Sequence, residues 1–253
     1  MTTFKIHKPE EIKPTTGGRI ILAWGLGGAG KTTLGVESAD VSQPLYYARF
    51  DTRNSDHMLA SYKGKALYSE YFPPQTDSAM ASFQMNRYKQ FISMAKANGD
   101  GVFIEDNMAT KWDMYKIACL PAGTAKPSPK DYAIGNNAMR EDYGALEESQ
   151  LWTVVTTPAV PLWDMVPNPN TGKNSLQDTG LYQPDGWKHF DYHSVASVYL
   201  FRTGKLMAVP MVPQEALSSG TFKALITESK LRPTVVGGIL DEPRLADVIK
   251  AVT

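Results

Sequence analysis

The residues best suited to chemistry lie in one glycine-rich run, Gly25-x-x-x-x-Gly30-Lys31-Thr32. Glycines let the backbone turn its N–H groups toward phosphate oxygens, and a helix that begins there presents its positive dipole end to the same anion. In this pattern the Lys31 ammonium reaches the β- and γ-phosphates, and the Thr32 hydroxyl binds Mg²⁺. The run predicts a site for ATP and Mg²⁺. The predicted nucleotide-binding residues are Gly25, Gly27, Gly28, Ala29, Gly30, Lys31, Thr32 and Thr33.

A phosphate loop also needs a carboxylate from a neighbouring strand to hold Mg²⁺ through its water shell. The run Val102-Phe-Ile-Glu105-Asp106 supplies two. Because adjacent side chains of a strand face opposite ways, we expect only one of them to face the nucleotide. Asp106 is the expected partner of Thr32 at the metal, and the alternative is that both carboxylates simply end a strand in solvent.

Hydrolysis requires, in addition, a group that orients or deprotonates the attacking water. Asp51 follows an apolar run at the edge where open α/β sheets bind ligands, and Glu105 is the other candidate. Thr156 and Thr157 end a further apolar run, where a hydroxyl could sense the γ-phosphate. An exposed turn aspartate and ordinary strand-end threonines are the alternatives. The predicted catalytic residues are Lys31, Asp51, Glu105 and Asp106.

Apolar runs and helical spacing predict the elements that position these residues. The run Arg19–Trp24 is continuously apolar after its first residue, as expected for a parallel strand covered on both faces. Further predicted strands are Leu45–Phe50, Val102–Ile104, Leu151–Val155, Val195–Arg202, Lys205–Val212 and Phe222–Thr227. Predicted helices are Lys31–Ala39, Met80–Asn98, a helix through Trp112 and Ile117, Lys130–Gln150, and Glu242–Val252 with Asp241 as N-cap.

Two stretches lack a clear periodicity of apolar residues. Residues 51–79 are polar and contain Pro73-Pro74, which predicts a loop with a short helix. Residues 158–187 hold so many prolines and glycines that no regular structure is expected, and a loop of this length is usually functional. The dipeptide Thr203-Gly204 predicts a hairpin between the strands on either side of it.

The composition indicates a folded chain without an extended charge field. The 253 residues include 26 basic and 26 acidic side chains, so the formal charge is zero and a nucleic acid would have to be held by a local patch. Cys119 has no partner for a disulfide, which predicts a cytoplasmic protein. No apolar run predicts a secretion signal or a membrane span. We expect an N-terminal extension at 1–18, one core at 19–228 and a C-terminal tail with a short helix at 229–253.

Taken together, these motifs resemble the core of RecA-like P-loop ATPases. The resemblance covers about residues 19–212 and is carried by Gly25 to Thr33, Tyr46 to Asp51, Phe103 to Asn107 and Val154 to Thr157. The chain looks most like the compact phage-encoded proteins of this type that are implicated in single-strand annealing and recombination. The resemblance implies an α/β fold with a mainly parallel sheet flanked by helices, a C-terminal antiparallel extension, and an oligomeric ATPase that acts on single-stranded DNA.

The chain departs from that family in two places. Glu105 precedes and Asn107 follows Asp106, where the family usually has a simple apolar run and then Asp followed by Ser or Thr. Pro158 follows Thr157, where such ATPases often have a polar residue followed by His or Gln. The first departure puts the metal ligand in question, and the second the γ-phosphate sensor.

In RecA-like proteins the segment after the fourth strand commonly faces DNA, and here residues 158–192 combine aromatics with lysines. One interpretation is that the aromatics stack on DNA bases and the lysines neutralise DNA phosphates. Aromatics that pin a long loop onto the core are the other. The side chains concerned are Trp163, Lys173, Tyr182, Trp187, Lys188, Phe190 and Tyr192.

Other candidates and functions remain open in the sequence. His189 and His193 have no third ligand cluster near them in the sequence, so we expect no metal site there. A basic group reaching a neighbouring subunit's nucleotide could be Lys188, Arg202 or Lys205. A DNA-packaging or assembly motor is the alternative function. A small-molecule kinase is disfavoured because 158–187 holds no arginine for a lid.

Overall fold

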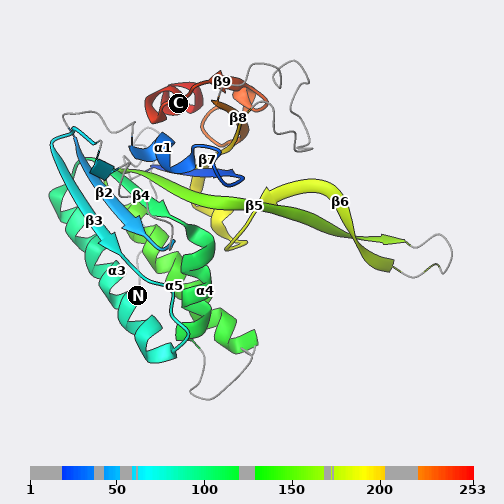
Figure 1. The fold of residues 1–253 in the computed structure, drawn as a ribbon, viewed down its shortest axis with the longest axis horizontal. Coiled ribbons are helices and arrows are strands. Elements are labelled where there is room, and N and C mark those ends of the chain that lie inside the picture. Colours follow the sequence, from blue (N-terminus) through cyan, green and yellow to red (C-terminus); the bar gives the residue numbers. More distant parts are fainter. Residues whose placement is uncertain are drawn as a thin grey trace, which may run out of the picture.

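A computed structural model describes residues 19–36, 43–51, 59, 60, 62–119, 129–167, 172, 174–202 and 222–253. Figure 1 shows the order of the elements along the chain. The strands are β1 Arg19–Gly25, β2 Pro44–Arg49, β3 Ala66–Tyr71, β4 Val102–Asp106, β5 Trp152–Pro167, β6 Asn174–Pro184, β7 Ser194–Arg202, β8 Phe222–Ser229 and β9 Ile239–Asp241. The α-helices are α1 Lys31–Val36, α3 Ser78–Asn98, α4 Met108–Ala118, α5 Pro129–Glu147 and α6 Leu245–Val252.

The strands form one central sheet in the order β3-β2-β4-β5-β1-β7-β8-β9. From β3 to β7 all neighbours are parallel, whereas β8 and β9 join the sheet antiparallel. The expected α/β fold with a mainly parallel sheet and an antiparallel C-terminal extension is confirmed. β5 lies between β1, which leads into the glycine-rich loop, and β4, which ends in Asp106.

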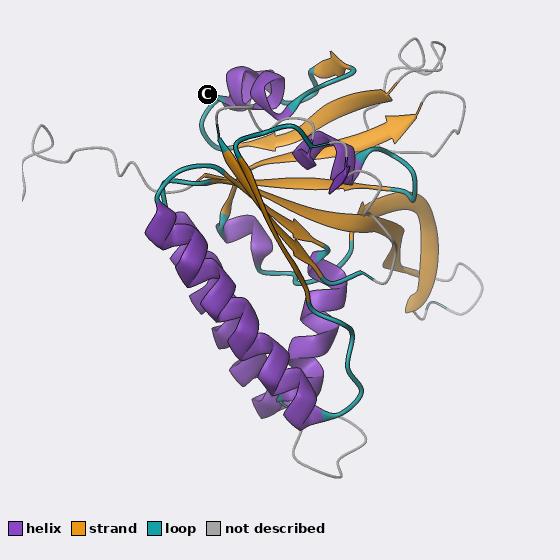
Figure 2. Ribbon diagram, turned by 60° about the vertical axis from the view of Figure 1, so that its left-hand side comes forward, coloured by secondary structure: helices purple, strands orange, loops and turns teal. Residues whose placement is uncertain are grey.

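Helices cover both faces of this sheet (Figure 2). On β1 the side chains of Ile20, Leu22 and Trp24 pack in the cluster that includes α3, α4 and α5, whereas Ile21 and Ala23 pack in the cluster that includes α1 and α6. The alternation follows from the two-residue period of a strand. Both faces are buried, which explains why this strand reads as a continuous apolar run.

The prediction that residues 158–187 lack regular structure is wrong. β5 continues past the sheet to Pro167 and pairs antiparallel with β6, and the two strands form a hairpin that projects from the body (Figure 1). Beyond the central sheet, the described residues of β5 and β6 pair only with each other, so the outer edge of each strand forms no ladder hydrogen bonds. Proline, which has no backbone N–H, is tolerated at such an edge. A register shift between Pro161 and Trp163 accommodates one of the prolines.

Two further segments differ from expectation. Residues 66–71 form edge strand β3 beside β2, where the sequence predicted a loop with a short helix. The C-terminal helix begins at Leu245 with Arg244 at its N-cap, because Ile239–Asp241 is drawn into β9 and pairs with β8. The predicted boundary at residue 228 therefore lies inside β8.

Several predicted features lie outside the described residues. These are the extension 1–18, the last residues of the predicted helix Lys31–Ala39, the Thr203-Gly204 hairpin and the strand Lys205–Val212. The antiparallel partner of β7 is β8. Within the part of the chain that the structure describes, no helix has the length and apolar character needed to cross a bilayer.

Candidate functional site

The glycine-rich loop joins the buried strand β1 to the start of α1. Gly28 and Gly30 have positive φ angles of 77° and 85°, a region that glycine occupies without strain. At Gly25 the main chain passes so close to β7 that a Cβ atom would lie 2.2 Å from the carbonyl oxygen of Leu200. The backbone path therefore requires glycine at position 25 and favours it at positions 28 and 30, and the loop ends at a helix N-terminus that attracts anions.

Lys31 is the first residue of α1, and its side chain folds back over the loop. Its ammonium donates hydrogen bonds of 2.8 Å to the carbonyl oxygens of Gly25 and of Leu26. The ammonium is thus already held against the loop backbone, where the sequence predicts that it meets phosphate. Exchange of these carbonyl oxygens for phosphate oxygens would replace neutral acceptors by charged ones, which form stronger hydrogen bonds.

Asp106 receives hydroxyl groups from three elements of the site. One carboxylate oxygen accepts hydrogen bonds from Thr32 at 2.9 Å and from Tyr47 at 2.7 Å, and the other accepts one from Thr156 at 2.6 Å. The contacts join β2 and β5 and the carboxyl end of β4 to the second residue of α1. The structure therefore brings together Thr32 and Asp106, the two residues predicted to serve the metal, and places Thr156 beside them.

Asp51 lies directly after β2 at the same edge of the sheet. Its backbone N–H donates to the carbonyl oxygen of Asp106 at 3.3 Å, and its carboxylate accepts a hydrogen bond of 3.4 Å from the Asn107 amide. Asn107 also caps α4 by accepting from the N–H of Thr110. Asp51 is thus near Asp106 through the main chain, and its catalytic role remains a prediction.

The structure contradicts the assignment of Glu105 as a catalytic residue. Its side chain is fully buried and lies on the face of β4 that packs against α3, α4 and α5, away from Thr32 and Asp106. The carboxylate forms a 2.8 Å ion pair with Lys111 and accepts hydrogen bonds from the hydroxyls of Tyr88 and Tyr143. Because successive side chains of a strand point to opposite faces of the sheet, only Asp106 lies on the side of the glycine-rich loop.

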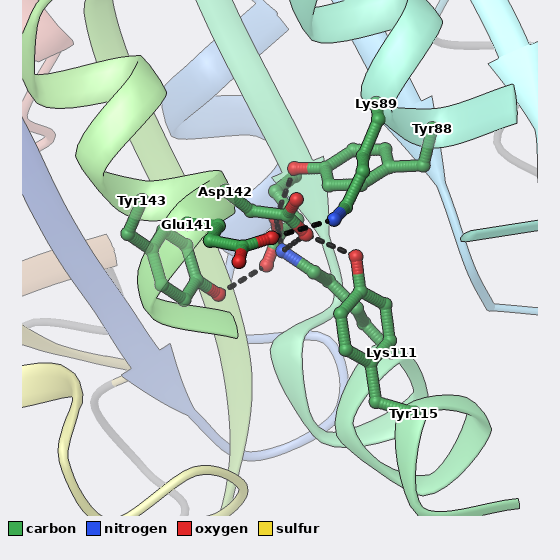
Figure 3. A network of polar contacts seen from close by, with 8 residues as sticks. Tyr88, Lys89, Lys111, Tyr115, Glu141, Asp142 and Tyr143 are labelled. Carbon is green, nitrogen blue, oxygen red and sulfur yellow. Dashed lines mark hydrogen bonds and ion pairs between the residues drawn. The ribbon is translucent and has the colours of Figure 1, made fainter. Parts of the chain in front are cut away.

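The partners of Glu105 belong to a buried polar network that the sequence did not reveal (Figure 3). Lys111 also lies 3.4 Å from the carboxylate of Asp142, which accepts a hydrogen bond from Tyr115. The Lys111 ammonium is 4.3 Å from the ring centres of both Tyr88 and Tyr143, so aromatic faces add to its stabilisation. One available signal was Lys111 itself, which lies three residues after Met108 and four before Tyr115 on the buried face of α4.

Burial dominates the ionisation of this network. Desolvation raises the pKa of Asp142 above its ordinary value, although nearby Lys111 opposes the change. Desolvation, followed by the negative field of the carboxylates, raises the pKa values of Tyr88, Tyr115 and Tyr143 well above 10. The three phenols therefore remain protonated donors, which suits their role around two buried carboxylates.

The aromatic side chains of residues 158–192 divide into two groups. Trp187 and Phe190 are buried against Tyr143, Trp187 stacked on its ring and Phe190 edge to face, so for these two the prediction that aromatics pin the segment onto the core is correct. Trp163, on the hairpin, and Tyr192 are 52% and 82% exposed. Tyr182 is partly buried against the core, Lys188 is exposed, and Lys173 lies outside the described residues.

Thr157 and His193 do not contact Asp106, and each has another partner. The Thr157 hydroxyl donates to the carbonyl oxygen of Asp185 at the base of the hairpin, not to Asp106. His193 pairs with Glu147 at 3.0 Å, and among the described residues no group of three or more His, Cys, Asp or Glu side chains could hold a metal ion. Of the candidates for a trans-acting group, Lys205 and the side chain of Arg202 lie outside the described part.

The residues present at the loop fit a magnesium nucleotide. Thr32 and Asp106 bring a hydroxyl and a carboxylate oxygen to within 2.9 Å of each other, and hard oxygen donors are the ligands that Mg²⁺ prefers. The positive φ angles of Gly28 and Gly30 give the loop the tight backbone turn that a phosphate cradle needs. Lys31 supplies the positive charge at the same place.

Comparisons with known proteins find similarity to solved structures. Neither a family model nor a curated protein sequence matches the chain. Among solved structures, a prototypical ATPase from the type III secretion system of pathogenic bacteria is similar with a TM-score of 0.45 and 15% identity. The alignment covers 74% of this chain and 53%, about half, of that protein.

Proposed function

We propose that this chain binds and hydrolyses ATP with Mg²⁺. The observation that carries the proposal is the hydrogen bond between Thr32, at the start of α1, and Asp106, at the end of β4. It places a hydroxyl and a carboxylate beside the glycine-rich loop, next to Lys31. Thr32 and Asp106 would hold the metal, Asp106 through its water shell, and backbone N–H groups from Gly25 to Thr33 would hold the phosphates.

Each residue of this site has a distinct chemical task in the proposal. Bound Mg²⁺ would neutralise charge that develops on the phosphates. Lys31 would exchange its loop carbonyl partners for phosphate oxygens. Asp51, at the same edge of the sheet, is the carboxylate proposed to orient the attacking water, since Glu105 is committed to Lys111 on the opposite face.

The test is Mg²⁺-dependent ATP turnover by the purified chain. We expect Lys31→Ala and Asp106→Asn each to lower turnover by about 100-fold or more, because Lys31 would neutralise phosphate charge directly and Asp106 would hold the Mg²⁺ that does so. Lys96→Ala is the matched control, since Lys96 pairs with Glu148 on the surface of α3. Equal turnover in wild type and Lys31→Ala, or no ATP binding by the wild type, would contradict the proposal.

We further propose single-stranded DNA as the partner, with Trp163 and Tyr192 as stacking platforms. Their exposure supports this proposal. Neither β5 nor β6 contains Lys or Arg, and the hairpin carries Asp164 and Asp178, so binding would depend on stacking more than on phosphate neutralisation. We expect single-stranded DNA to stimulate turnover and Trp163→Ala to reduce the stimulation. Turnover indifferent to DNA, together with no binding at low salt, would overturn this partner.

Nucleotide-dependent assembly is the second candidate function, favoured by an apolar patch on the hairpin. Met165 and Leu176 are cross-strand partners and are 56% and 61% exposed. A homo-oligomer would cover such side chains. Sedimentation with and without ATP tests this: a change of mass that Met165→Lys abolishes supports assembly, and an unchanging monomer contradicts it.

A further inference from the structure

A cleft of about 310 Å³ opens beside the glycine-rich loop, on the side away from Asp106. Its walls come from the loop and α1, from β7 and β8, and from the turn between β9 and α6. In the sheet, β7 and β8 lie to one side of β1, whereas β5 and β4 lie to the other. The loop is therefore flanked by the Thr32–Asp106 contact on one side and by this cleft on the other. Its lining includes Gly30, Thr33, Leu200, Phe222, Glu242 and Arg244.

The cleft combines an apolar wall with a polar rim. The ring of Phe222 lies directly against the loop, since a Cβ atom on Gly30 would be 3.0 Å from its Cε1 atom. Leu200 extends the apolar wall, and Thr33, Glu242 and Arg244 bring a hydroxyl, a carboxylate and a guanidinium to the lining. Ligand sites for small organic molecules have this character, with volumes from about 300 Å³ upward.

The rim is held in a conformation that costs energy. Glu242 has a φ angle of 42°, and among the described residues it is the one non-glycine residue with positive φ. Its backbone N–H donates to the carbonyl oxygen of Phe222 at 2.8 Å, while Lys223 and Asp241 pair at 2.6 Å in the adjoining strands. Strained residues persist where their surroundings determine them, and they concentrate at ligand sites.

We propose that this cleft holds the nucleobase and ribose of the nucleotide whose phosphates occupy the loop, an inference that rests on the proposed function. Phe222 supplies the aromatic face for the base, and Glu242 the acceptor for ribose hydroxyls. Arg244, an exposed cation at the rim, closes over the base or the α-phosphate. The C-terminal segment after residue 221 would then complete the nucleotide site that begins at Gly25.

The experiment compares two ligands that share the phosphates and differ in the nucleoside. Binding of Mg²⁺–ATP and of Mg²⁺–tripolyphosphate is measured by calorimetry for the wild type, Phe222→Leu and Glu242→Gln. Phe222→Leu keeps apolar bulk and removes the stacking ring. We expect it to weaken ATP binding by about 10-fold, in line with the stacking of a base on an aromatic side chain, and to leave tripolyphosphate within about twofold. Glu242→Gln should weaken the binding of ATP and leave the binding of 2′,3′-dideoxy-ATP, which lacks the ribose hydroxyls, unchanged.

The controls separate failure of the cleft from failure of the loop. Phe83→Leu is the matched substitution at a phenylalanine that is 53% exposed on α3, and it should change neither ligand. Lys31→Ala should weaken both ligands together. If the wild type binds neither ligand, the proposed function itself is contradicted. The other outcome is that the wild type binds both ligands, and the Phe222 and Glu242 variants lower the two affinities equally or not at all. In that case the phosphate loop keeps its proposed role and the cleft assignment is overturned.

Discussion

Glu105 and Asp106 are consecutive residues of β4, and their carboxylates serve opposite faces of the sheet. Asp106 accepts hydroxyl donors from Thr32 and Thr156 on the α1 side, whereas Glu105 is paired with Lys111 under the long helices. One short strand thus carries both the proposed metal-linked carboxylate and the centre of a buried polar network. The two carboxylates should respond differently to substitution.

The Thr156 hydroxyl should matter for turnover, because it holds one oxygen of Asp106 while Thr32 binds the other. We expect Thr156→Val to lower kcat about tenfold with little change in KM, which corresponds to one hydrogen bond lost in positioning. Steady-state kinetics measures this. Thr157→Val is the control, since its hydroxyl serves Asp185 and its loss should affect stability alone. Equal kcat values for the Thr156 variant and the wild type would refute the positioning role.

Removal of the Lys111 charge should destabilise the fold strongly. Lys111→Met leaves Glu105 and Asp142 buried without their cation, and such a loss costs about 3–5 kcal/mol of unfolding free energy. Urea denaturation measures the change. Lys116→Met, which breaks a surface pair with Asp113, should cost less than about 1 kcal/mol. A Lys111→Met variant as stable as the Lys116 variant would show that the network contributes little.

The raised pKa of Asp142 predicts the sign of a pH effect. A carboxyl group whose pKa is higher in the folded state than its ordinary 3.8 favours folding when protonated, so this contribution is complete below that value and is lost as pH rises through the folded pKa. Asp142→Asn removes this dependence. The stability of the wild type relative to Asp142→Asn should therefore fall as the pH rises above the ordinary value of 3.8. A difference that stays constant or rises over this range, measured by denaturation at each pH, would be the contrary result.

Two loop glycines should differ in their tolerance of a methyl group. Gly25→Ala places Cβ 2.2 Å from the backbone oxygen of Leu200, which cannot yield as a side chain would. Gly28→Ala meets nothing within 4 Å and pays only for its positive φ, about 1 kcal/mol. We expect Gly25→Ala to lose several kcal/mol or fail to fold, as seen by thermal melting. Similar melting temperatures for the two variants would contradict this backbone path.

The sequence was most informative where local chemistry dictates local structure. The glycine-rich run, the strand before it and the helix after it lie where their residues predicted, and the period of β4 indicated that only one of its two carboxylates would face the loop. The hairpin was missed because Pro161 and Pro167 indicate a loop unless the strands have open outer edges. That condition is a property of the sheet and cannot be read from the segment itself.

The buried network was missed for a related reason. Lys111 and Asp142 are ordinary charged residues of two helices, and only the packing of α4 and α5 against β4 brings them to Glu105. The cleft beside the loop combines residues near positions 30, 200, 222 and 242. Such contacts between residues far apart in the sequence follow from the order of the strands in the sheet, which a single sequence does not specify.

The length of β5 has a mechanical consequence. Its inner part is fixed where Thr156 meets Asp106, and its outer part runs out of the body to Pro167, a span of roughly 36 Å at about 3.3 Å per residue. A change of about 3° in the direction of the strand at Thr156 displaces the far end by about 2 Å. β5 therefore connects the Asp106 contact beside the phosphate loop directly to the far end of the hairpin.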